Sequence, residues 1–149
     1  MNSTAMKTET NVKQAVPFLM VANIEKSVDF YVNGLGFAMT NKWIPQDKIE
    51  WCWLQYGGAA LMLQEFRKEK RELLAAEGQK LGVGVSICFQ CGDALAIYRE
   101  VKSRGIQAEQ PFVGNAMWVT SMSDSDGYKL FFESPTDAPE ESLYSEPVE

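Results

Sequence analysis

One order of predicted elements, a strand, a helix and then three strands, occurs twice along the chain, and this duplication restricts the fold more than any other feature. In the first copy, an apolar strand at residues 16–21 precedes a helix that Asn23 caps, with Gly34 and Gly36 as the stop signal. Three further strands are predicted at residues 37–44, 49–56 and 59–65, the last two joined by a tight turn at Gly57-Gly58.

The second copy repeats this order from residue 83 onward. A strand at residues 83–91 leads to a helix that Asp93 caps, with Arg104 in its last turn and Gly105 just past its end. The remaining strands are predicted at residues 107–113, 117–123 and 128–133. The turn Asp124-Ser125-Asp126-Gly127 joins the last two of them.

Two constant shifts relate the copies. A shift of 70 residues places Asn23 on Asp93, and a shift of 69 places Gly58 on Gly127 and aligns the apolar residues of the strand that follows. Shifts that differ by one residue indicate a single insertion or deletion within the repeated unit. Chance similarity between apolar strands is the competing explanation, because only two copies are present.

The length of 149 residues is typical of one domain. We interpret residues 1–14 as a loose arm and residues 135–149 as an acidic tail, because both segments are polar and lack periodicity. Between them, residues 15–134 are expected to form a single α+β domain of two βαβββ modules. The first module spans residues 15–66, the second module spans residues 83–134, and a charged helix links them.

The composition excludes several kinds of chemistry. The chain contains no histidine, so Ser-His-Asp and Cys-His nucleophile systems and His-ligated metal centres cannot form within it. With 14 Lys and Arg against 20 Asp and Glu, the formal net charge is −6. This acidic balance argues against nucleic acid as a partner, because a nucleic-acid footprint requires clustered basic residues.

The three cysteines and the hydropathy indicate an intracellular protein. Cys52, Cys88 and Cys91 are an odd number, and no apolar signal segment precedes them, so we expect buried free thiols rather than a disulfide framework. Cys88 and Cys91 form a C-x-x-C, but they lie in a predicted strand, where residues three apart point to opposite faces. No apolar stretch approaches the roughly 20 residues that cross a bilayer. We therefore expect a cytoplasmic protein with no membrane partner.

Three segments carry a resemblance to a known superfamily: FLMVANIEKSVDFYVNGLGF (residues 18–37), GGAALMLQE (57–65) and DSDGYKLFFE (124–133). They resemble the vicinal-oxygen-chelate superfamily of glyoxalases, bleomycin-resistance proteins and extradiol dioxygenases, and the match covers residues 15–134. The resemblance implies a glyoxalase/bleomycin-resistance/dioxygenase-like fold in which two βαβββ modules form curled mixed sheets around a cleft. In such proteins the cleft is commonly completed across a homodimer.

The resemblance also implies where a metal would lie. Enzymes of the superfamily hold it with one residue from the first and one from the last strand of each module. The corresponding positions here are Val16, Met62, Ser86 and Phe131, of which only the Ser hydroxyl is even a weak ligand. The chain is therefore most similar to the metal-free, bleomycin-resistance-like branch, and we expect no metal and no cofactor. A displaced site at Gln64 and Glu133 is the alternative, with two oxygen donors and no imidazole.

The same positions predict an apolar cleft lined by tryptophan. Alternation along the strands selects residues that share a face with the four positions above. In the strand at residues 49–56 the tryptophan face is chosen because Leu54 resembles the residue that packs under the helices in relatives, and Trp43 and Trp118 are further candidates near the rim. The candidate ligand-binding residues are Phe18, Met20, Trp43, Trp51, Trp53, Gln55, Met62, Gln64, Ser86, Cys88, Gln90, Trp118, Phe131 and Glu133. The competing interpretation is that the Trp and Phe side chains are ordinary core and that Glu133 is a solvated strand end.

Three functions fit this pattern. The first is a metal-free protein that binds an aromatic or cationic organic ligand, in the way bleomycin-resistance proteins sequester a drug. The second is a metal-dependent glyoxalase-type lyase, isomerase or dioxygenase with a displaced metal, or a metal-free enzyme with Glu133 as the candidate base. The third is a structural or regulatory dimer whose cleft is filled by its own side chains. We expect the first.

Overall fold

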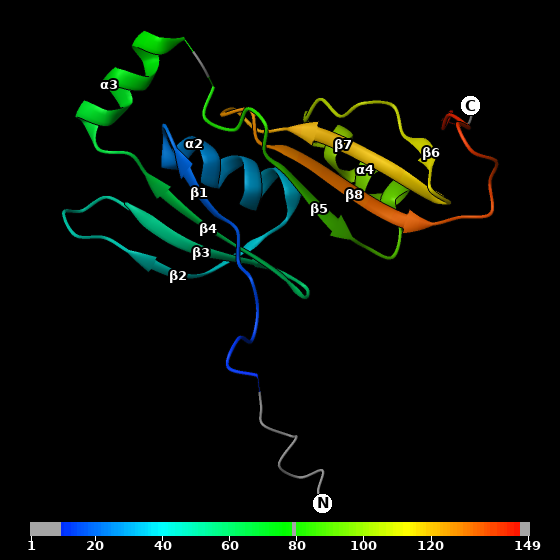
Figure 1. Ribbon diagram of the computed structural model, residues 1–149, viewed down its shortest axis with the longest axis horizontal. Helices are drawn as coiled ribbons and strands as arrows, with labels where there is room; N and C mark the ends of the chain where they lie inside the picture. Colours follow the sequence, from blue (N-terminus) through cyan, green and yellow to red (C-terminus); the bar gives the residue numbers. More distant parts are fainter. Residues whose placement is uncertain (1–9, 79, 147–149) are drawn as a thin grey trace, which may run out of the picture.

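A computed structural model describes residues 10–78 and 80–146 and contains two four-stranded sheets (Figure 1). The strand orders are β1-β4-β3-β2 and β5-β8-β7-β6, with one parallel pair in each sheet, β1 with β4 and β5 with β8. Neither sheet closes on itself, and the predicted α+β fold of two βαβββ modules is confirmed. Within the described residues, no helix is long and apolar enough to cross a membrane.

The first module begins with the predicted strand and capped helix. The side chain of Asn23 accepts a hydrogen bond from the Lys26 N–H at 3.1 Å and so caps the helix. The helix then widens into a π-helix, which the sequence did not predict. Its elements are β1 (Phe18–Val21), α2 (Ile24–Val28), η1 (Asp29–Leu35), β2 (Ala38–Trp43), β3 (Trp51–Tyr56) and β4 (Ala59–Glu65).

The linking helix α3 (Lys68–Glu77) leads into the second module, whose own helix is capped by Asp93. The Asp93 carboxylate accepts hydrogen bonds from two backbone N–H groups of the first turn, at 3.1 and 3.0 Å. The elements are β5 (Ser86–Gln90), α4 (Ala94–Ser103), β6 (Phe112–Gly114), β7 (Met117–Ser123) and β8 (Lys129–Pro135). The predicted strands at 83–91 and 107–113 are therefore shorter in the structure.

The strand registers of the two sheets match the two shifts found in the sequence. Phe18 pairs with Met62 in the first module, and Cys88 pairs with Phe131 in the second. From residue 18 to 88 the shift is 70, and from 62 to 131 it is 69. The modules are thus equivalent strand by strand and residue by residue in their central pairs.

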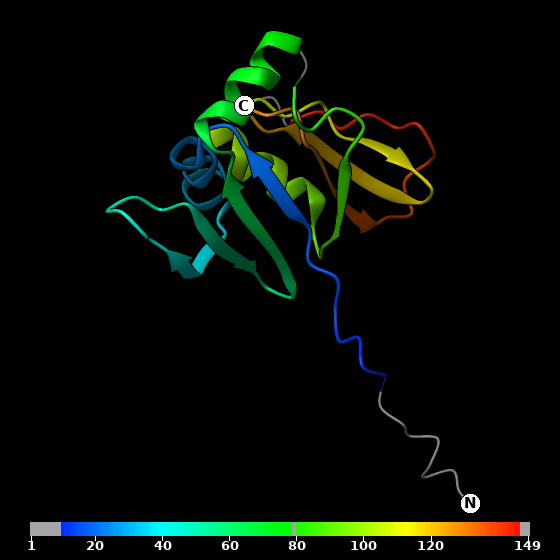
Figure 2. The ribbon, with the colours of Figure 1, turned by 60° about the vertical axis from the view of Figure 1, so that its left-hand side comes forward.

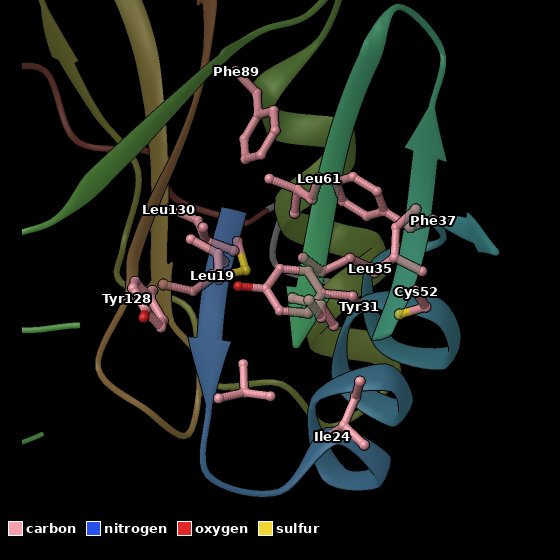
Figure 3. Close-up of a cluster of buried hydrophobic side chains, with 14 of the residues drawn as sticks. Leu19, Ile24, Tyr31, Leu35, Phe37, Cys52, Leu61, Phe89, Tyr128 and Leu130 are labelled. Carbon is pink, nitrogen blue, oxygen red and sulfur yellow. The ribbon is translucent and has the colours of Figure 1, made fainter. Parts of the chain in front are cut away.

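The buried side chains of both modules form one hydrophobic cluster rather than two separate cores. Leu54 and Leu61 of the first module and Leu130 of the second are completely buried in it. Figure 3 shows side chains from both modules pointing toward one another in this cluster, with Phe89 at one end near Phe37. One face of each sheet therefore packs toward the other module, and the opposite face of each sheet points away from this core.

The turn between β7 and β8 joins the two modules through buried hydrogen bonds. The Tyr31 hydroxyl donates to the Asp124 carboxylate at 2.6 Å, and the Tyr128 hydroxyl donates to the Met20 carbonyl at 2.7 Å. The Ala22 N–H also donates to the Asp126 carboxylate, at 3.4 Å. The polar turn of the second module thus fixes the position of the first strand and helix of the first.

The described part of the C-terminal segment is packed against the second module, whereas the sequence predicted a loose tail. The Val113 N–H donates to the Ser142 carbonyl at 2.9 Å, and Leu143 bridges to Phe112. The Tyr144 ring lies edge-on to that of Tyr98 in α4. Hydrogen bonding to the free edge of β6 and packing of the Tyr144 ring explain why this segment is held against the second module.

The N-terminal segment leaves the body of the molecule in an extended conformation (Figures 1 and 2). Residues 10–15 are mostly exposed, and Val12 has 78% of its surface accessible. This part of the chain agrees with the predicted loose arm. The rest of the predicted arm, residues 1–9, and the end of the predicted tail, residues 147–149, lie outside the described residues.

Candidate functional site

The face of the first sheet that points away from the core carries the tryptophans of β3. In this strand Cys52 and Leu54 are completely buried, whereas Trp51 and Trp53 are half-buried. The core packs against one set of alternating residues, which leaves the other set partly open to solvent. We call this surface the outer face of the first module. Its predicted site residues are Phe18, Met20, Trp43, Trp51, Trp53, Gln55, Met62 and Gln64.

The apolar side chains of this face lie beside one another across three strand pairs. Trp53 is opposite Met62, which is in turn opposite Phe18. Trp43 of β2 is opposite Trp51 and is 53% exposed, and Phe18 is 46% exposed. Large apolar groups with this much accessible surface form a contiguous patch that suits contact with another molecule.

Two glutamines give the outer face of the first module its polar groups. The Trp53 indole N–H donates to the Gln55 side-chain oxygen at 2.9 Å, and the Gln55 amide donates to the Gly57 carbonyl at 3.3 Å. These bonds orient the Trp53 ring along the strand. Gln64, half-buried opposite Trp51, is the second polar group of this face.

The outer face of the second module carries five predicted residues on the paired strands β5 and β8. The residues are Ser86, Cys88, Gln90, Phe131 and Glu133. The Gln90 amide donates to the Glu133 carboxylate at 3.1 Å and to the Cys88 sulfur at 3.3 Å. Partial burial, together with the neighbouring Glu133, raises the pKa of the Cys88 thiol above its ordinary value.

Cysteine exposure differs from the prediction of buried thiols. Cys52 is buried, as expected, but Cys88 is exposed and Cys91 is only half-buried. The reason is the position of β5, which is an edge strand whose outer face is uncovered. The Cys91 thiol lies beyond the end of that strand and donates to the Glu133 carbonyl at 3.5 Å.

The outer face of the second module also carries a cation that was not among the predicted site residues. The Lys129 ammonium lies 5.6 Å from the centre of the Phe131 ring and 3.2 Å from the Glu109 carboxylate. Hydrogen bonds from Ser121 and Lys129 lower the pKa of Glu109. Lys129 could have been found from the sequence, because it lies two residues before Phe131 and so shares its face.

Trp118 does not lie with the other candidate residues. In β7 it is opposite Ser134, whose side chain accepts from the Ala94 N–H at 2.8 Å, so Trp118 is on the side of the sheet that faces α4. Its ring packs edge-on against Tyr144 at 6.2 Å. The sequence predicts Trp118 near the rim of the cleft, whereas the structure places it on the core side of its sheet, because the small polar side chains of Thr120 and Ser134 turn toward the start of α4.

The structure therefore brings the other thirteen predicted residues together as two surfaces and not as one enclosed cleft within the chain. In each sheet, the face opposite the outer face packs into the shared core. The two outer faces therefore point away from that core.

Comparison with known proteins identifies the superfamily of the chain. The family model described as the glyoxalase/bleomycin resistance protein/dioxygenase superfamily matches residues 12–132. The chain belongs to this superfamily. No curated protein matches the chain.

Several solved structures of the superfamily fold are similar to the chain. A bleomycin-binding protein in complex with bleomycin is 23% identical, with a TM-score of 0.63, and the match covers 83% of this chain and 98% of that one. A bleomycin resistance determinant encoded on transposon Tn5 is 23% identical, with a TM-score of 0.62 over 85% and 100% of the two chains. TnmS3, an antibiotic-binding protein from Streptomyces sp. CB03234, is 19% identical, with a TM-score of 0.63 over 86% and 100%.

The positions at which superfamily enzymes hold a metal do not suit one here. Met62 lies among Phe18 and Trp53, and Phe131 lies between Cys88 and Ser121. Thioether and phenyl groups are poor ligands for the divalent ions that carboxylates and imidazoles bind. Of the alternative pair, Gln64 is on the first module and Glu133 is on the second, each on its own outer face. The donor set of this member does not fit a catalytic metal.

Proposed function

We propose that this protein is a metal-free small-molecule-binding protein of the bleomycin-resistance type, which holds an aromatic or cationic organic ligand against the outer face of the first module. The observation that carries the proposal is the pair of half-buried tryptophans on that face, next to exposed Phe18. Flat aromatic ligands gain affinity by stacking on such rings, and a few polar groups fix their orientation. The similar structures include a bleomycin-binding protein and an antibiotic-binding protein, which supports the same class of ligand.

A second copy of the chain would close this site. Both outer faces point away from the shared core, so they are free to meet a second copy. The first module of one copy would then face the second module of its partner. A two-fold axis between the copies would create two equal clefts. Each cleft would then combine the tryptophans of β3 with Gln90 and Glu133. The carboxylate of Glu133 would favour a cationic group on the ligand, whereas Lys129 is already paired with Glu109.

Titration of tryptophan fluorescence tests the proposal directly. Bleomycin and the planar cation proflavine serve as probes, and we expect saturable quenching by at least one of them. Trp53→Ala should weaken binding by about fivefold or more, since loss of one stacked ring costs on the order of 1 kcal/mol. Trp118→Phe is the matched control, because Trp118 lies on the opposite side of its sheet and packs against Tyr144.

Two results would contradict the proposal. One is the absence of saturable quenching by either probe, and the other is an equal loss of affinity in Trp53→Ala and Trp118→Phe. Metal analysis of the dialysed protein tests the metal-free part separately. A stoichiometric divalent ion that survives dialysis would favour the glyoxalase-type enzyme instead.

A further inference from the structure

A pocket of about 400 Å³ lies between the modules within a single chain, apart from the tryptophan-bearing face. It opens where the turn between β3 and β4 approaches the end of β5 and helix α4. This is also the end of the core at which Figure 3 shows Phe89 and Phe37. The residues that line it are Phe37, Tyr56, Gly58, Ala59, Cys88, Phe89, Gln90, Cys91, Ile97 and Phe132. Its volume falls in the range of small-molecule sites.

The wall of this inter-module pocket is a connected set of aromatic rings. Phe37 lies edge-on to Tyr56, with ring centres 5.2 Å apart, and Phe89 is stacked on Phe132 at 4.9 Å. Phe37 and Phe89 are themselves 5.9 Å apart, so the four rings are continuous. No ionised side chain is among the described residues that line the pocket. An uncharged planar aromatic molecule matches this wall, whereas a charged ligand would lose its hydration without an ion pair.

The polar groups of the pocket indicate what the ligand must carry. The two donors of the Gln90 amide are used by Glu133 and Cys88, which leaves its carbonyl oxygen as an acceptor. The Cys91 thiol donates to the Glu133 carbonyl, and its raised pKa keeps it protonated near neutrality. A ligand hydroxyl could donate to Gln90 while its rings contact the phenylalanines. We propose that the inter-module pocket is a binding site for a planar aromatic phenol, distinct from the tryptophan-bearing face of the first module, with Gln90 at the border of both sites.

The turn at the mouth of the pocket offers a substitution that fills it without disturbing the fold. Gly57 has φ of 55° and supplies the left-handed conformation that the turn needs, but Gly58 does not have a positive φ. A Cβ added at Gly58 would meet nothing within 4 Å. Gly58→Leu should therefore occupy the space that a ligand needs. Gly92→Leu is the matched control, since Gly92 has equally open surroundings but does not line the pocket.

Isothermal titration calorimetry with 2-naphthol tests the proposal. We expect one saturable site per chain, at least tenfold weaker binding by Gly58→Leu, and unchanged binding by Gly92→Leu and Trp53→Ala. No saturable binding to the wild-type protein would overturn the proposal. Loss of binding in Trp53→Ala with full binding in Gly58→Leu would also overturn it, because the naphthol would then lie on the outer face. Failure of bleomycin or proflavine to bind would leave this result unaffected.

A second measurement does not depend on any variant. Addition of 2-naphthol to the wild-type protein should shift the backbone amide resonances of Gly58, Gln90 and Cys91 in an NMR titration. It should also slow alkylation of the Cys91 thiol. Amide shifts confined to β3 and β2, with no change in the rate of Cys91 alkylation, would count against the pocket.

Discussion

Removal of one hydroxyl group tests whether the turn between β7 and β8 holds the modules together. The Tyr31 hydroxyl is buried and donates to one oxygen of the Asp124 carboxylate at 2.6 Å. The other oxygen accepts from the backbone N–H groups of Asp126 and Tyr128, at 2.9 and 3.0 Å. Tyr31→Phe therefore removes one of three donors to a carboxylate that is only 5% exposed.

We expect Tyr31→Phe to lower the free energy of unfolding by about 1.5–3 kcal/mol at neutral pH, the usual value of a hydrogen bond to a charged group. Packing should change little, because the phenyl ring keeps its edge-on contacts with the rings of Phe30 and Phe37, at 5.1 and 5.8 Å. For a chain of this size the loss corresponds to a decrease in Tm of roughly 4–10 °C.

The effect should depend on pH in a defined direction. Burial raises the pKa of Asp124 above its ordinary value, and the hydrogen bond from Tyr31 partly opposes this increase. The native state therefore binds the Asp124 proton more tightly than the unfolded state does. The resulting stabilisation of the fold is fully present below the pKa of the unfolded state, ~3.9, and is lost as the pH increases through the raised pKa of the native state. Tyr31→Phe raises that pKa further, so its cost should be largest at neutral pH and smallest in acid.

Urea denaturation followed by tryptophan fluorescence, at several pH values between 4 and 8, measures this dependence. Tyr144→Phe is the control, because the Tyr144 hydroxyl accepts a hydrogen bond from Arg99 at the surface, at 3.2 Å. We expect the control to cost less than about 0.5 kcal/mol. A Tyr31→Phe protein within 0.5 kcal/mol of wild type at neutral pH, or one with a pH-independent loss, would refute the reasoning.

Three further predictions concern single side chains. Gly82→Ala should cost about 1–3 kcal/mol in urea denaturation, because its Cβ would lie 2.2 Å from the Tyr128 nitrogen; an unchanged midpoint would contradict this contact. Burial raises the pKa of Cys52 to about 11, so iodoacetamide should label Cys88 in the native protein and Cys52 only after unfolding, as mass spectrometry can show. The pKa of exposed Glu109 is lowered, so Glu109→Gln should reduce the free energy of unfolding at neutral pH by less than about 1 kcal/mol, and by nothing once the native carboxylate is protonated. Added salt should weaken this reduction. A reduction that does not depend on salt would argue against an ionic origin.

Local signals in the sequence were sufficient to predict the duplicated fold. Asn23 and Asp93 cap the two helices as expected, and the Gly57-Gly58 pair forms the two-residue turn between β3 and β4. Alternation along β3 also separated Cys52 and Leu54 from the two tryptophans, and in the structure the first pair is the buried one. These features depend on residues close in sequence, so their physical causes are visible without the tertiary structure.

Features that depend on contacts between distant segments could not be predicted in the same way. Trp118 shares a face with Thr120, whose hydroxyl donates to the Ala94 carbonyl at 2.8 Å, and alternation alone does not indicate which face of β7 meets α4. The order of the C-terminal segment depends on the free edge of β6, which becomes available only in the folded sheet. The direction of the two outer faces likewise depends on how the modules pack, since each module has the same internal pattern in any arrangement.

The two modules have diverged at the positions that matter most for a ligand. The strand registers place Trp51 and Trp53 of the first module opposite Gln64 and Met62, and the corresponding residues of the second module are Val119 and Ser121. Ser121 is only 2% exposed, because the segment before β6 runs beside it. The Glu109 N–H donates to the Ser121 carbonyl at 2.9 Å, and the Ser121 hydroxyl donates to the Glu109 carboxylate at 2.8 Å.

This segment covers Ser121, which corresponds to Trp53 of the first module. The two outer faces are therefore not interchangeable, although their backbones are equivalent. The tryptophans of the outer faces belong to the first module, whereas the second contributes the Phe131 ring beside the Lys129 ammonium and a carboxylate held by Gln90. A ligand bound between copies of this chain would meet one wall with tryptophans and one wall with a carboxylate, a cation and the Phe131 ring. A molecule with a flat ring system on one side and a cationic or hydrogen-bonding group on the other therefore fits better than a symmetric one.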